Sequence, residues 1–379
     1  MRIGFDARYV DDRYHGVGRY AYQVLEALTR LYPDDRFAVY HNPARPSTRL
    51  DLRGVLARPN VEPRPLPHDI YSPLEQPALA LAALRSRPDV LYTPYFPAPL
   101  LAPAPVVVTV HDLIFDREPR YQTGRWVRYY YRPMMALAVL RSAAVIAVSK
   151  ATASDLQAFY RVPTGRVAVI PEAAGPQFRR VEDSAALAAV RRHYALPDRF
   201  ILALGVRRPH KNLVALLEAF ALARDRVPHD LVLVGEVHAR YHDEVPAAIA
   251  RLGLFGRVRL IGHAADEDLP AIYTLADLFV LPSLLEGFGL PALEAMACGA
   301  PVVASNTSSL PEVVGEAGLL VDPRDPAALA EAISRVALDR QLHARLAAAG
   351  LARAQEFSWE RAARQVRQVL ARAAGQARP

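Results

Sequence analysis

The chain is poor in cysteine, in lysine and in long apolar runs. Its 379 residues include one cysteine, Cys298, which excludes an internal disulfide and any metal cluster built on several cysteines. No stretch approaches about 18 uninterrupted apolar residues, the length expected of a membrane-spanning helix. The first residues also lack the basic start and long apolar run of a signal peptide. We therefore expect a soluble, cytoplasmic protein.

The positive charge of the chain is unevenly distributed. Of its 46 basic residues only Lys150 and Lys211 are lysines, and the net charge is +7. Residues 1–180 carry 24 Lys and Arg against 16 Asp and Glu, whereas residues 181–379 carry 22 against 23. A bias towards GC-rich codons explains the many arginines. A basic N-terminal half also suits an anionic partner, such as a lipid-linked phosphate, nucleic acid or the phospholipids at the inner face of a membrane, where we expect peripheral contact.

Short apolar runs alternate with helical patterns along most of the chain. This order is typical of βαβ units with parallel sheets, and a length of 379 residues fits two domains. In the first half the expected strands are 2–7, 37–41, 89–93, 106–111, 144–149 and 167–171. In the second half they are 200–205, 231–235, 258–262, 278–282, 302–305 and 319–321.

The polar, irregular segment near residues 173–183 marks the expected boundary between the two domains. We place the N-terminal domain at 1–180, the C-terminal domain at 181–355, and a terminal helix and tail at 356–379. Phe357, Ala363, Val366 and Leu370 recur at roughly helical spacing in that helix. The helix could therefore pack outside the C-terminal domain and cross back to the first.

The segment EGFGLPALE at residues 286–294 follows an expected strand. Gly287, Phe288 and Gly289 allow a tight turn, and Pro291 suits the first position of a helix. The free N–H groups of a helix start favour an anion such as a diphosphate. Glu286 in the loop and Glu294 about one turn into the helix can then accept hydrogen bonds from the hydroxyls of one ligand. A plain helix start is the alternative.

This segment, with AMACGAPVVASNTSSLPEVVGEAGLLVDP after it, resembles the paired-glutamate signature of the retaining glycosyltransferases of family 4. The resemblance runs from about Phe200 to Asp325. It implies a GT-B fold, with two doubly wound Rossmann-like domains whose parallel sheets face each other across a cleft. It also implies that the N-terminal domain binds the acceptor, whereas the C-terminal domain binds the sugar nucleotide. Glu294 would bind the ribose, and Glu286 would bind the donor sugar. The backbone amides from Gly287 to Leu290 would bind the sugar and the diphosphate.

A cationic turn, VRRPHKN, follows the expected strand at 200–205. Lys211 is a compact cation suited to a phosphate, in a chain that otherwise uses arginine. Members of family 4 often carry an arginine five residues before this lysine, and here that position is Val206. Arg207 or Arg208 could replace it, or Lys211 and backbone amides could suffice.

Two further motifs lie in the N-terminal half. Gly16, Val17 and Gly18 form a glycine loop that leads into an amphipathic helix, and it resembles the loop that closes over the donor phosphate in family 4. A loop that merely turns the chain is the alternative. His111 follows an expected strand, and the resemblance places it at the reacting centre near the donor sugar. A buried histidine with a purely structural partner is the alternative.

Other patterns are weaker. Asp266, Glu267 and Asp268 spell a metal-binding DxD, but they precede an expected helix and are interpreted as its cap. The histidines lack metal-ligand spacing, so we expect neither a metal nor another cofactor. Residues 125–135 interleave arginine with aromatics, which fits a solvated helix with a buried stripe, or contact with an acceptor or a membrane.

Together these features predict a metal-independent hexosyltransferase in which His111 and Glu286 act in catalysis. The turn with Lys211, the HDL segment and SSLPEV resemble the mannosyltransferase-like branch of the family, which implies GDP-mannose as donor and a saccharide or lipid-linked acceptor, with no role for nucleic acid. A GT-B epimerase or phosphorylase, and a non-catalytic saccharide- or nucleotide-binding protein on the same fold, are the alternatives.

Overall fold

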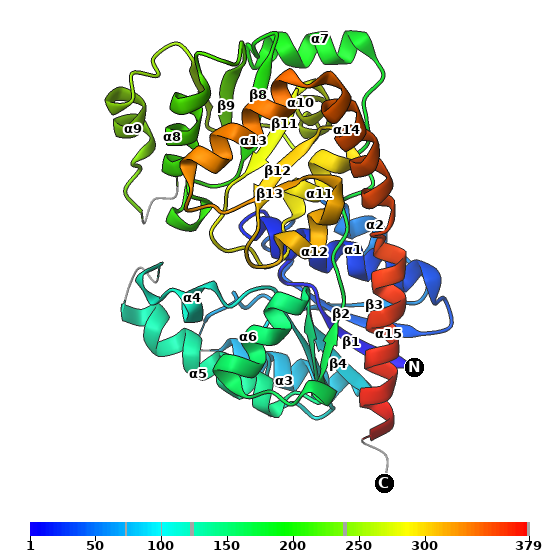
Figure 1. Cartoon of the computed structure of the whole chain (residues 1–379). Coiled ribbons are helices and arrows are strands. Elements are labelled where there is room, and N and C mark those ends of the chain that lie inside the picture. The colour runs from blue at the N-terminus through cyan, green and yellow to red at the C-terminus, as the bar shows by residue number, and fades with distance from the viewer. Residues whose placement is uncertain (73, 100, 122–124, 238–240, 377–379) are drawn as a thin grey trace. The chain divides into compact units, whose positions relative to one another are not determined.

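A computed structural model describes residues 1–72, 74–99, 101–121, 125–237 and 241–376, with the backbone alone for residues 15, 125–128 and 376. The chain divides into two compact units. Unit 1 comprises Met1–Glu172 and Ser358–Pro379, and unit 2 comprises Ala173–Phe357. Each unit is an α/β layer structure around its own parallel sheet (Figure 1).

Unit 1 contains a seven-stranded sheet in the order β3-β2-β1-β4-β5-β6-β7, and every pairing is parallel. Its strands are β1 (Arg2–Asp6), β2 (Arg36–His41), β3 (Val61–Pro65), β4 (Val90–Thr93), β5 (Val106–Val110), β6 (Ala144–Ala147) and β7 (Val167–Val169). Its α-helices are α1 (His15–Leu31), α2 (Leu52–Leu56), α3 (Glu75–Ser86), α4 (Ile114–Arg117), α5 (Arg125–Arg141), α6 (Lys150–Tyr160) and α15 (Trp359–Gln376), and its 3₁₀ turns are Pro119–Tyr121 and Thr164–Arg166.

Unit 2 contains a six-stranded sheet in the order β10-β9-β8-β11-β12-β13, again with parallel pairings. Its strands are β8 (Phe200–Leu204), β9 (Asp230–Val234), β10 (Val258–Ile261), β11 (Leu278–Leu281), β12 (Val302–Ser305) and β13 (Leu319–Val321). Its α-helices are α7 (Ser184–His193), α8 (Leu213–Ala223), α9 (Val245–Arg251), α10 (Leu269–Leu275), α11 (Leu290–Ala297), α12 (Leu310–Val314), α13 (Pro326–Leu338) and α14 (Arg340–Gln355), and its 3₁₀ turns are Pro209–Lys211 and Gly315–Ala317.

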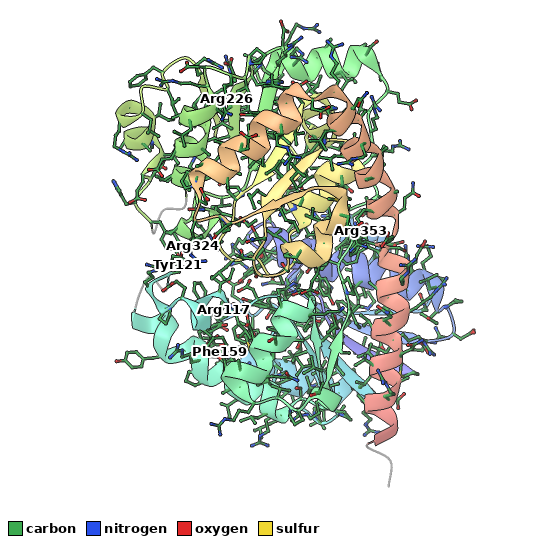
Figure 2. The ribbon with its side chains drawn as sticks, in the orientation of Figure 1. Arg117, Tyr121, Phe159, Arg226, Arg324 and Arg353 are labelled. Carbon is green, nitrogen blue, oxygen red and sulfur yellow. The ribbon has the colours of Figure 1, made fainter. Side chains whose placement is uncertain are left out.

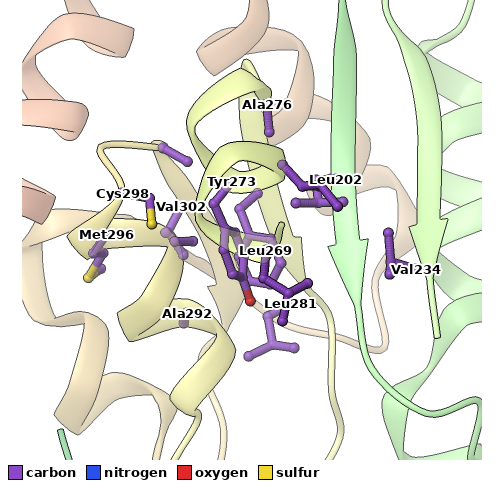
Figure 3. Close-up of a cluster of buried hydrophobic side chains, with 14 of the residues drawn as sticks. Leu202, Val234, Leu269, Tyr273, Ala276, Leu281, Ala292, Met296, Cys298 and Val302 are labelled. Atoms are coloured by element: carbon purple, nitrogen blue, oxygen red, sulfur yellow. The ribbon is translucent and has the colours of Figure 1, made fainter. Parts of the chain in front are cut away.

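The two faces of the unit 2 sheet bury separate apolar layers. Alternate strand residues such as Leu202 and Leu281 pack with α7, α10, α11 and α12, as Figure 3 shows around Tyr273. Their neighbours Ile201 and Val280 pack with α8, α9, α13 and α14 on the opposite face. Burial on both faces explains why these strands are almost continuously apolar in sequence. The doubly wound architecture predicted from that pattern is confirmed.

The last helix, α15, belongs to unit 1 and packs beside α1. Its apolar face, with Ala363, Val366 and Leu370, is buried, and Arg367 donates to the buried Asp35 carboxylate at 2.7 Å. The expected return of the C-terminal helix to the first unit is therefore confirmed. Phe357, which the spacing placed on this helix, precedes it and instead contacts Phe288, with 5.8 Å between the ring centroids.

All twelve expected strands are present, and one further strand, β3, was not predicted. Its sequence, VEPRP, has two prolines and two charged residues, a composition depleted in strands. It is an edge strand, where proline is tolerated because one side of the backbone needs no ladder partner. The position in the sheet therefore overrides the local propensity.

Candidate active site

The sheet of unit 2 reverses its strand order between β8 and β11. In open parallel sheets, ligands bind beyond the carboxyl ends of the strands at such a reversal. Lys211 ends the 3₁₀ turn that follows β8, and Glu286 lies in the loop after β11. The structure therefore brings these two predicted residues together at the place where the topology favours a ligand.

The Lys211 ammonium and the Glu286 carboxylate form a nearly buried ion pair. Lys211 Nζ lies 2.7 Å from Glu286 Oε1, with 16% and 10% of the two side chains exposed. The same oxygen accepts from Ser283 Oγ at 2.7 Å. Among the described residues Glu286 Oε2 has no hydrogen-bond partner, and Glu286 is the one partner of the ammonium. One carboxylate oxygen and two ammonium N–H groups are thus open to a ligand.

The charges around this pair shape its ionisation. Burial alone would raise the pKa of Glu286, but Lys211 and His210, together with hydrogen bonds from Lys211 and Ser283, hold it below its ordinary value. His210 is itself buried, and burial followed by the charge of Lys211 lowers its pKa to about 4. At neutral pH the site therefore holds a charged carboxylate and a neutral imidazole.

Serines that precede α12 fix the loop after Glu286. Ser308 Oγ donates to the Glu286 carbonyl at 2.6 Å, and Ser309 Oγ donates to the Phe288 carbonyl at 2.7 Å. Arg353 of α14, labelled in Figure 2, supports α12 by donating to the carbonyl of Val313 at 3.0 Å. These contacts preorganise the loop before any ligand binds.

Helix α11 begins after Gly289, whose φ of +109° is a left-handed conformation that favours glycine. A Cβ at this position would also lie 2.6 Å from Leu310 Cδ2. Pro291 takes the second helical position, one later than expected, and in the described part of the chain no side chain caps this helix start. Gly287, Phe288, Gly289 and Leu290 therefore form the expected turn into a helix N-terminus. Their binding to a sugar or diphosphate stays a prediction.

Glu294 lies inside α11 and only 3% of it is exposed. Its Oε2 accepts from the hydroxyl of Tyr273 at 3.1 Å, which comes from α10 and is shown in Figure 3. The two glutamates of the motif therefore have different surroundings, since Glu286 is bound by a cation and Glu294 by a phenol. The predicted role of Glu294 on a ribose is not tested by this contact.

The two candidate arginines near Val206 differ. Arg207 Nη1 forms a 2.7 Å ion pair with Asp243 Oδ2, and both side chains are mostly buried. The Nε of Arg208 is buried without a hydrogen-bond partner among the described residues. Val206 itself is 36% exposed. Arg207 is thus engaged within unit 2, whereas Arg208 retains an unsatisfied donor.

In unit 1, His111 directly follows β5 and is held at both ring nitrogens. Its Nδ1 lies 2.8 Å from Glu172 Oε1, and its Nε2 lies 2.9 Å from the carbonyl oxygen of Pro94. Because a carbonyl and a carboxylate only accept, both nitrogens are donors and the ring is an imidazolium. Burial would lower the pKa of His111, but the hydrogen bond and charge of Glu172 outweigh it and hold the pKa above its ordinary value.

Gly16, Val17 and Gly18 lie in the first turn of α1, so the prediction of a glycine loop before the helix is wrong. The Gly18 N–H donates to the Tyr14 carbonyl at 2.6 Å, and this bond closes the first turn. A Cβ on Gly18 would lie 2.6 Å from the Tyr9 carbonyl oxygen, which gives this glycine a packing reason. Gly16 has no atom within 4 Å of such a Cβ. Contact of these residues with a donor phosphate stays a prediction.

Asp268 stands at the start of α10, but its side chain does not cap that helix as expected. Its Oδ2 instead accepts from the Tyr194 hydroxyl at 2.8 Å, because α7 packs against α10. In the described ranges no group of three or more His, Cys, Asp or Glu could hold a metal. Metal independence and the lack of a cofactor stay predictions.

Residues 125–135 belong to α5, but the side chains of 125–128 lie outside the described residues. The predicted contact of this segment with an acceptor or a membrane therefore stays a prediction. Among the helices of the described residues, none combines the length and the apolar character that a membrane span requires.

Several residues of these sites were not predicted. Glu172 and Ser283 each stand shortly after the carboxyl end of a parallel strand, the position that identified His111. The same positional signal could have found them. Ser308 and Ser309 follow the end of β12 in the same way, so the signal applies to them as well. Tyr273 lies inside α10 and carries no such signal, because it reaches the site through tertiary packing.

Comparisons with known proteins cover most of the chain. The family model described as Glycosyltransferase Family 4 matches residues 14–174, and the model described as Glycosyl transferases group 1 matches residues 191–353. The O-antigen chain mannosyltransferase B of Escherichia coli is 30% identical over 378 residues, which are 95% of this chain and 97% of that protein.

Two further comparisons agree with these matches. The serotype-specific mannosyltransferase WbdA of Escherichia coli is 35% identical over 274 residues, which are 71% of this chain and 33% of that protein. The sucrose-phosphate synthase tll1590 from Thermosynechococcus elongatus has a similar structure, with a TM-score of 0.77, 24% identity and coverage of 100% of both chains. At that identity the likeness shows the fold alone.

Proposed function

Because the chain belongs to glycosyltransferase family 4 and is a glycosyltransferase of GT-B fold, we propose that it transfers a mannosyl group from GDP-mannose to a saccharide or lipid-linked acceptor. Transfer with retention at the anomeric carbon is part of the proposal. Mannose is favoured because the relative matched over nearly the whole chain is named a mannosyltransferase.

The observation that carries the proposal is the Lys211–Glu286 pair at the strand reversal of unit 2. A nearly buried carboxylate with one open oxygen suits the hydroxyl of a donor sugar, and an ammonium with two open N–H groups suits a diphosphate. The N-terminus of α11 adds the positive end of a helix dipole. The donor site of the proposal therefore comprises Lys211, Glu286, residues 287–290 and Glu294.

Arg208 completes this donor site in the proposal. Its unsatisfied Nε is available to a phosphate oxygen, whereas Arg207 is neutralised by Asp243. A buried guanidinium donor without a partner costs free energy, which a bound anion would recover. Arg208 thus takes the role that family 4 often gives to an arginine at the position of Val206.

The chemistry asks for two kinds of stabilisation. The leaving diphosphate gains negative charge as its bond to the sugar breaks, and fixed cations and backbone N–H groups stabilise it without reorganisation. The donor sugar gains positive charge on its ring, and a carboxylate that holds one of its hydroxyls orients it. We assign the first role to Lys211 and Arg208 and the second to Glu286. The imidazolium of His111 is the proposed contribution of unit 1.

Peripheral membrane contact through the basic N-terminal half is a separate part of the proposal. It rests on the excess of basic over acidic residues within 1–180. Electrostatic attraction to anionic lipids falls with ionic strength. Co-sedimentation with vesicles that contain anionic lipid should therefore show binding that is lost at high salt. Equal binding to neutral vesicles would contradict this part alone.

The transfer itself is tested by incubating the protein with GDP-mannose and a panel of methyl α-hexopyranosides. The expected product is an α-linked mannoside, identified by mass spectrometry and by the anomeric signals in proton NMR. A β-linked product would contradict retention. Epimerised nucleotide sugar formed without any acceptor would contradict transfer and favour the epimerase alternative.

Donor choice is tested by thermal shift with GDP-mannose and with other nucleotide sugars. A ligand at 100 times its Kd adds about 2.7 kcal/mol to the free energy of unfolding, so binding is readily seen. GDP-mannose should give the largest shift. If no nucleotide sugar raises the melting temperature, the donor site is wrong.

A further inference from the structure

The sheet of unit 1 also reverses its strand order, between β1 and β4. By the rule applied to unit 2, a ligand is favoured beyond the carboxyl ends of these two strands. Arg8 and Tyr9 follow β1, and Tyr95 follows β4. None of these residues belongs to the predicted donor site.

A group of tyrosines gathers at this place. The ring of Tyr9 makes edge contacts with those of Tyr14 and Tyr95, each with 5.6 Å between centroids, and Tyr71 makes one with Tyr130 at 5.6 Å. Tyr71 is joined to the first group through Glu75, which accepts from the Tyr71 N–H at 2.7 Å and lies 3.5 Å from Arg8 Nη2. We call these five residues the tyrosine cluster.

The tyrosine cluster surrounds a buried charged centre. Arg8 donates twice to the Asp6 carboxylate, at 2.8 and 2.7 Å, and its Nη2 lies 3.5 Å from Glu75 Oε1. All three side chains are at least 98% buried. Burial, opposed by the charge of Arg8, raises the pKa of Glu75 to about 7.

Two polar atoms of this centre lack a partner among the described residues. They are Arg8 Nη1 and the hydroxyl of Tyr9, which belong to side chains 2% and 0% exposed. A buried polar group without a hydrogen bond destabilises the folded chain, and native proteins keep few of them. Two such groups on successive residues at a strand reversal indicate a ligand that supplies the missing acceptors.

Tyr71 has a strained backbone conformation. Its φ is +69°, which is rare for a bulky residue, and its N–H donates to Glu75 Oε2 at 2.7 Å. With 39% of its surface exposed, it is the most exposed residue of the cluster. Strain of this kind persists where surrounding contacts enforce it, and it concentrates at binding sites.

The tyrosine cluster is continuous with His111. The Tyr95 ring, which packs on Tyr9, also contacts the His111 ring with 5.9 Å between centroids. An acceptor hydroxyl must reach the reacting centre, to which the proposed function assigns His111. A saccharide bound at the cluster would therefore lie next to a residue of the transfer reaction.

We infer that the tyrosine cluster and Arg8 form the subsite for a terminal hexopyranose of the saccharide acceptor, an assignment that rests on the proposed function. Aromatic rings pack against the apolar face of a pyranose, and its hydroxyls accept from Arg8 Nη1 and from the Tyr9 hydroxyl. Entry of the sugar requires Tyr71 to turn aside. Glu75 holds Tyr71 and Arg8 in place as a positioning residue.

The decisive variant is Tyr9→Phe, which removes only the unpartnered hydroxyl. In the free protein it should leave the melting temperature unchanged or raise it, because no hydrogen bond is lost. Binding of methyl α-mannoside, followed by saturation-transfer NMR, should weaken about tenfold, the loss of one buried hydrogen bond. Tyr71→Ala should weaken it at least as much.

Two controls separate this inference from the proposed function. Tyr129→Ala alters a 69% exposed tyrosine on the same helix as Tyr130. It should change the binding of neither methyl α-mannoside nor GDP-mannose. GDP-mannose binding should stay within about twofold in Tyr9→Phe and Tyr71→Ala. If the wild type does not bind GDP-mannose, the donor site of unit 2 is wrong instead.

The inference is overturned if Tyr9→Phe and Tyr71→Ala both bind methyl α-mannoside as the wild type does. It is also overturned if the wild type binds none of the methyl α-hexopyranosides while it binds GDP-mannose. A stability loss in Tyr9→Phe with unchanged sugar binding would assign the hydroxyl a purely structural role.

Discussion

The two units each bury a cation–carboxylate pair beyond the carboxyl ends of a parallel sheet, but the cations differ. In unit 2 the pair is Lys211 with Glu286, and lysine keeps its charge through the neutral range. In unit 1 it is His111 with Glu172, and the charge of a histidine depends on its surroundings. Unit 2 therefore offers a permanent charge to a ligand, whereas unit 1 offers one that pH can remove.

Replacing Lys211 tests the permanent charge and should have the largest effect. Lys211→Met should lower kcat/KM about 100-fold or more, because a fixed cation at the diphosphate is lost. It also leaves Glu286 buried without its ion partner, which destabilises unit 2. The double variant Lys211→Met, Glu286→Gln should restore the melting temperature but not the activity.

The matched control is Lys150→Met, since these are the two lysines of the chain and Lys150 is exposed at the start of α6. Lys150→Met should change neither kcat/KM nor the melting temperature. If Lys211→Met keeps the wild-type kcat/KM per folded molecule, Lys211 acts through stability alone.

Acid should destabilise unit 2 through His210. Its pKa of about 4 lies below the ordinary 6.5, so the unfolded chain takes up a proton first as the pH falls. Stability is therefore present above pH 6.5 and is lost between about 6.5 and 4, by at most about 3 kcal/mol. Melting temperatures measured across this range should fall less in His210→Asn than in the wild type. Parallel curves would show that His210 does not sense acid.

Replacing Arg207 and Arg208 one at a time tests which of the two arginines binds the donor. Arg208→Ala should weaken GDP-mannose binding about tenfold, the value of a charge-assisted hydrogen bond. Arg207→Ala should lower the melting temperature, because it leaves Asp243 unpaired, and should leave the Kd unchanged. Calorimetric titration of both variants distinguishes the assignments. A larger affinity loss in Arg207→Ala would reverse them.

Glu172→Gln tests the titratable charge and should have the smallest effect. Without the carboxylate the pKa of His111 falls, since the hydrogen bond and charge of Glu172 are the largest of the causes that raise it. If the imidazolium is the active form, the alkaline limb of kcat/KM moves to lower pH, and activity below that limb is retained. The raised pKa also stabilises the folded wild type below the ordinary pKa, and this stability is lost as pH rises through the raised value. An unmoved alkaline limb would refute the role of the charge.

Local signals in the sequence predicted most of this architecture. Apolar runs located the strands of both sheets, because strands buried on two faces tolerate few polar residues. The sequence does not predict β3, because its prolines and charged residues are tolerated only at the edge of a sheet, and that position is set by the tertiary structure. The glycines of α1 predict a loop, because no sequence pattern indicates the hydrogen bond to the Tyr14 carbonyl that closes the first turn of the helix.

The candidate sites were predictable to the extent that their residues follow strands. Lys211, Glu286 and His111 all do, and the first two meet at 2.7 Å. Their partners were less accessible to sequence reasoning. Nothing local pairs Arg207 with Asp243, and Tyr273 reaches Glu294 only because α10 packs on α11. The availability of Arg208 likewise follows from tertiary contacts.

The most direct test of the donor site is calorimetric titration of GDP and of GDP-mannose into the wild type, Glu294→Gln and Glu286→Gln. In the proposed donor site Glu294 binds the ribose and Glu286 binds the sugar. Glu294→Gln should therefore weaken both ligands equally, whereas Glu286→Gln should weaken GDP-mannose and leave GDP unchanged. Wild-type protein that binds neither ligand, or variants that both bind GDP-mannose as the wild type does, would contradict a donor site in unit 2.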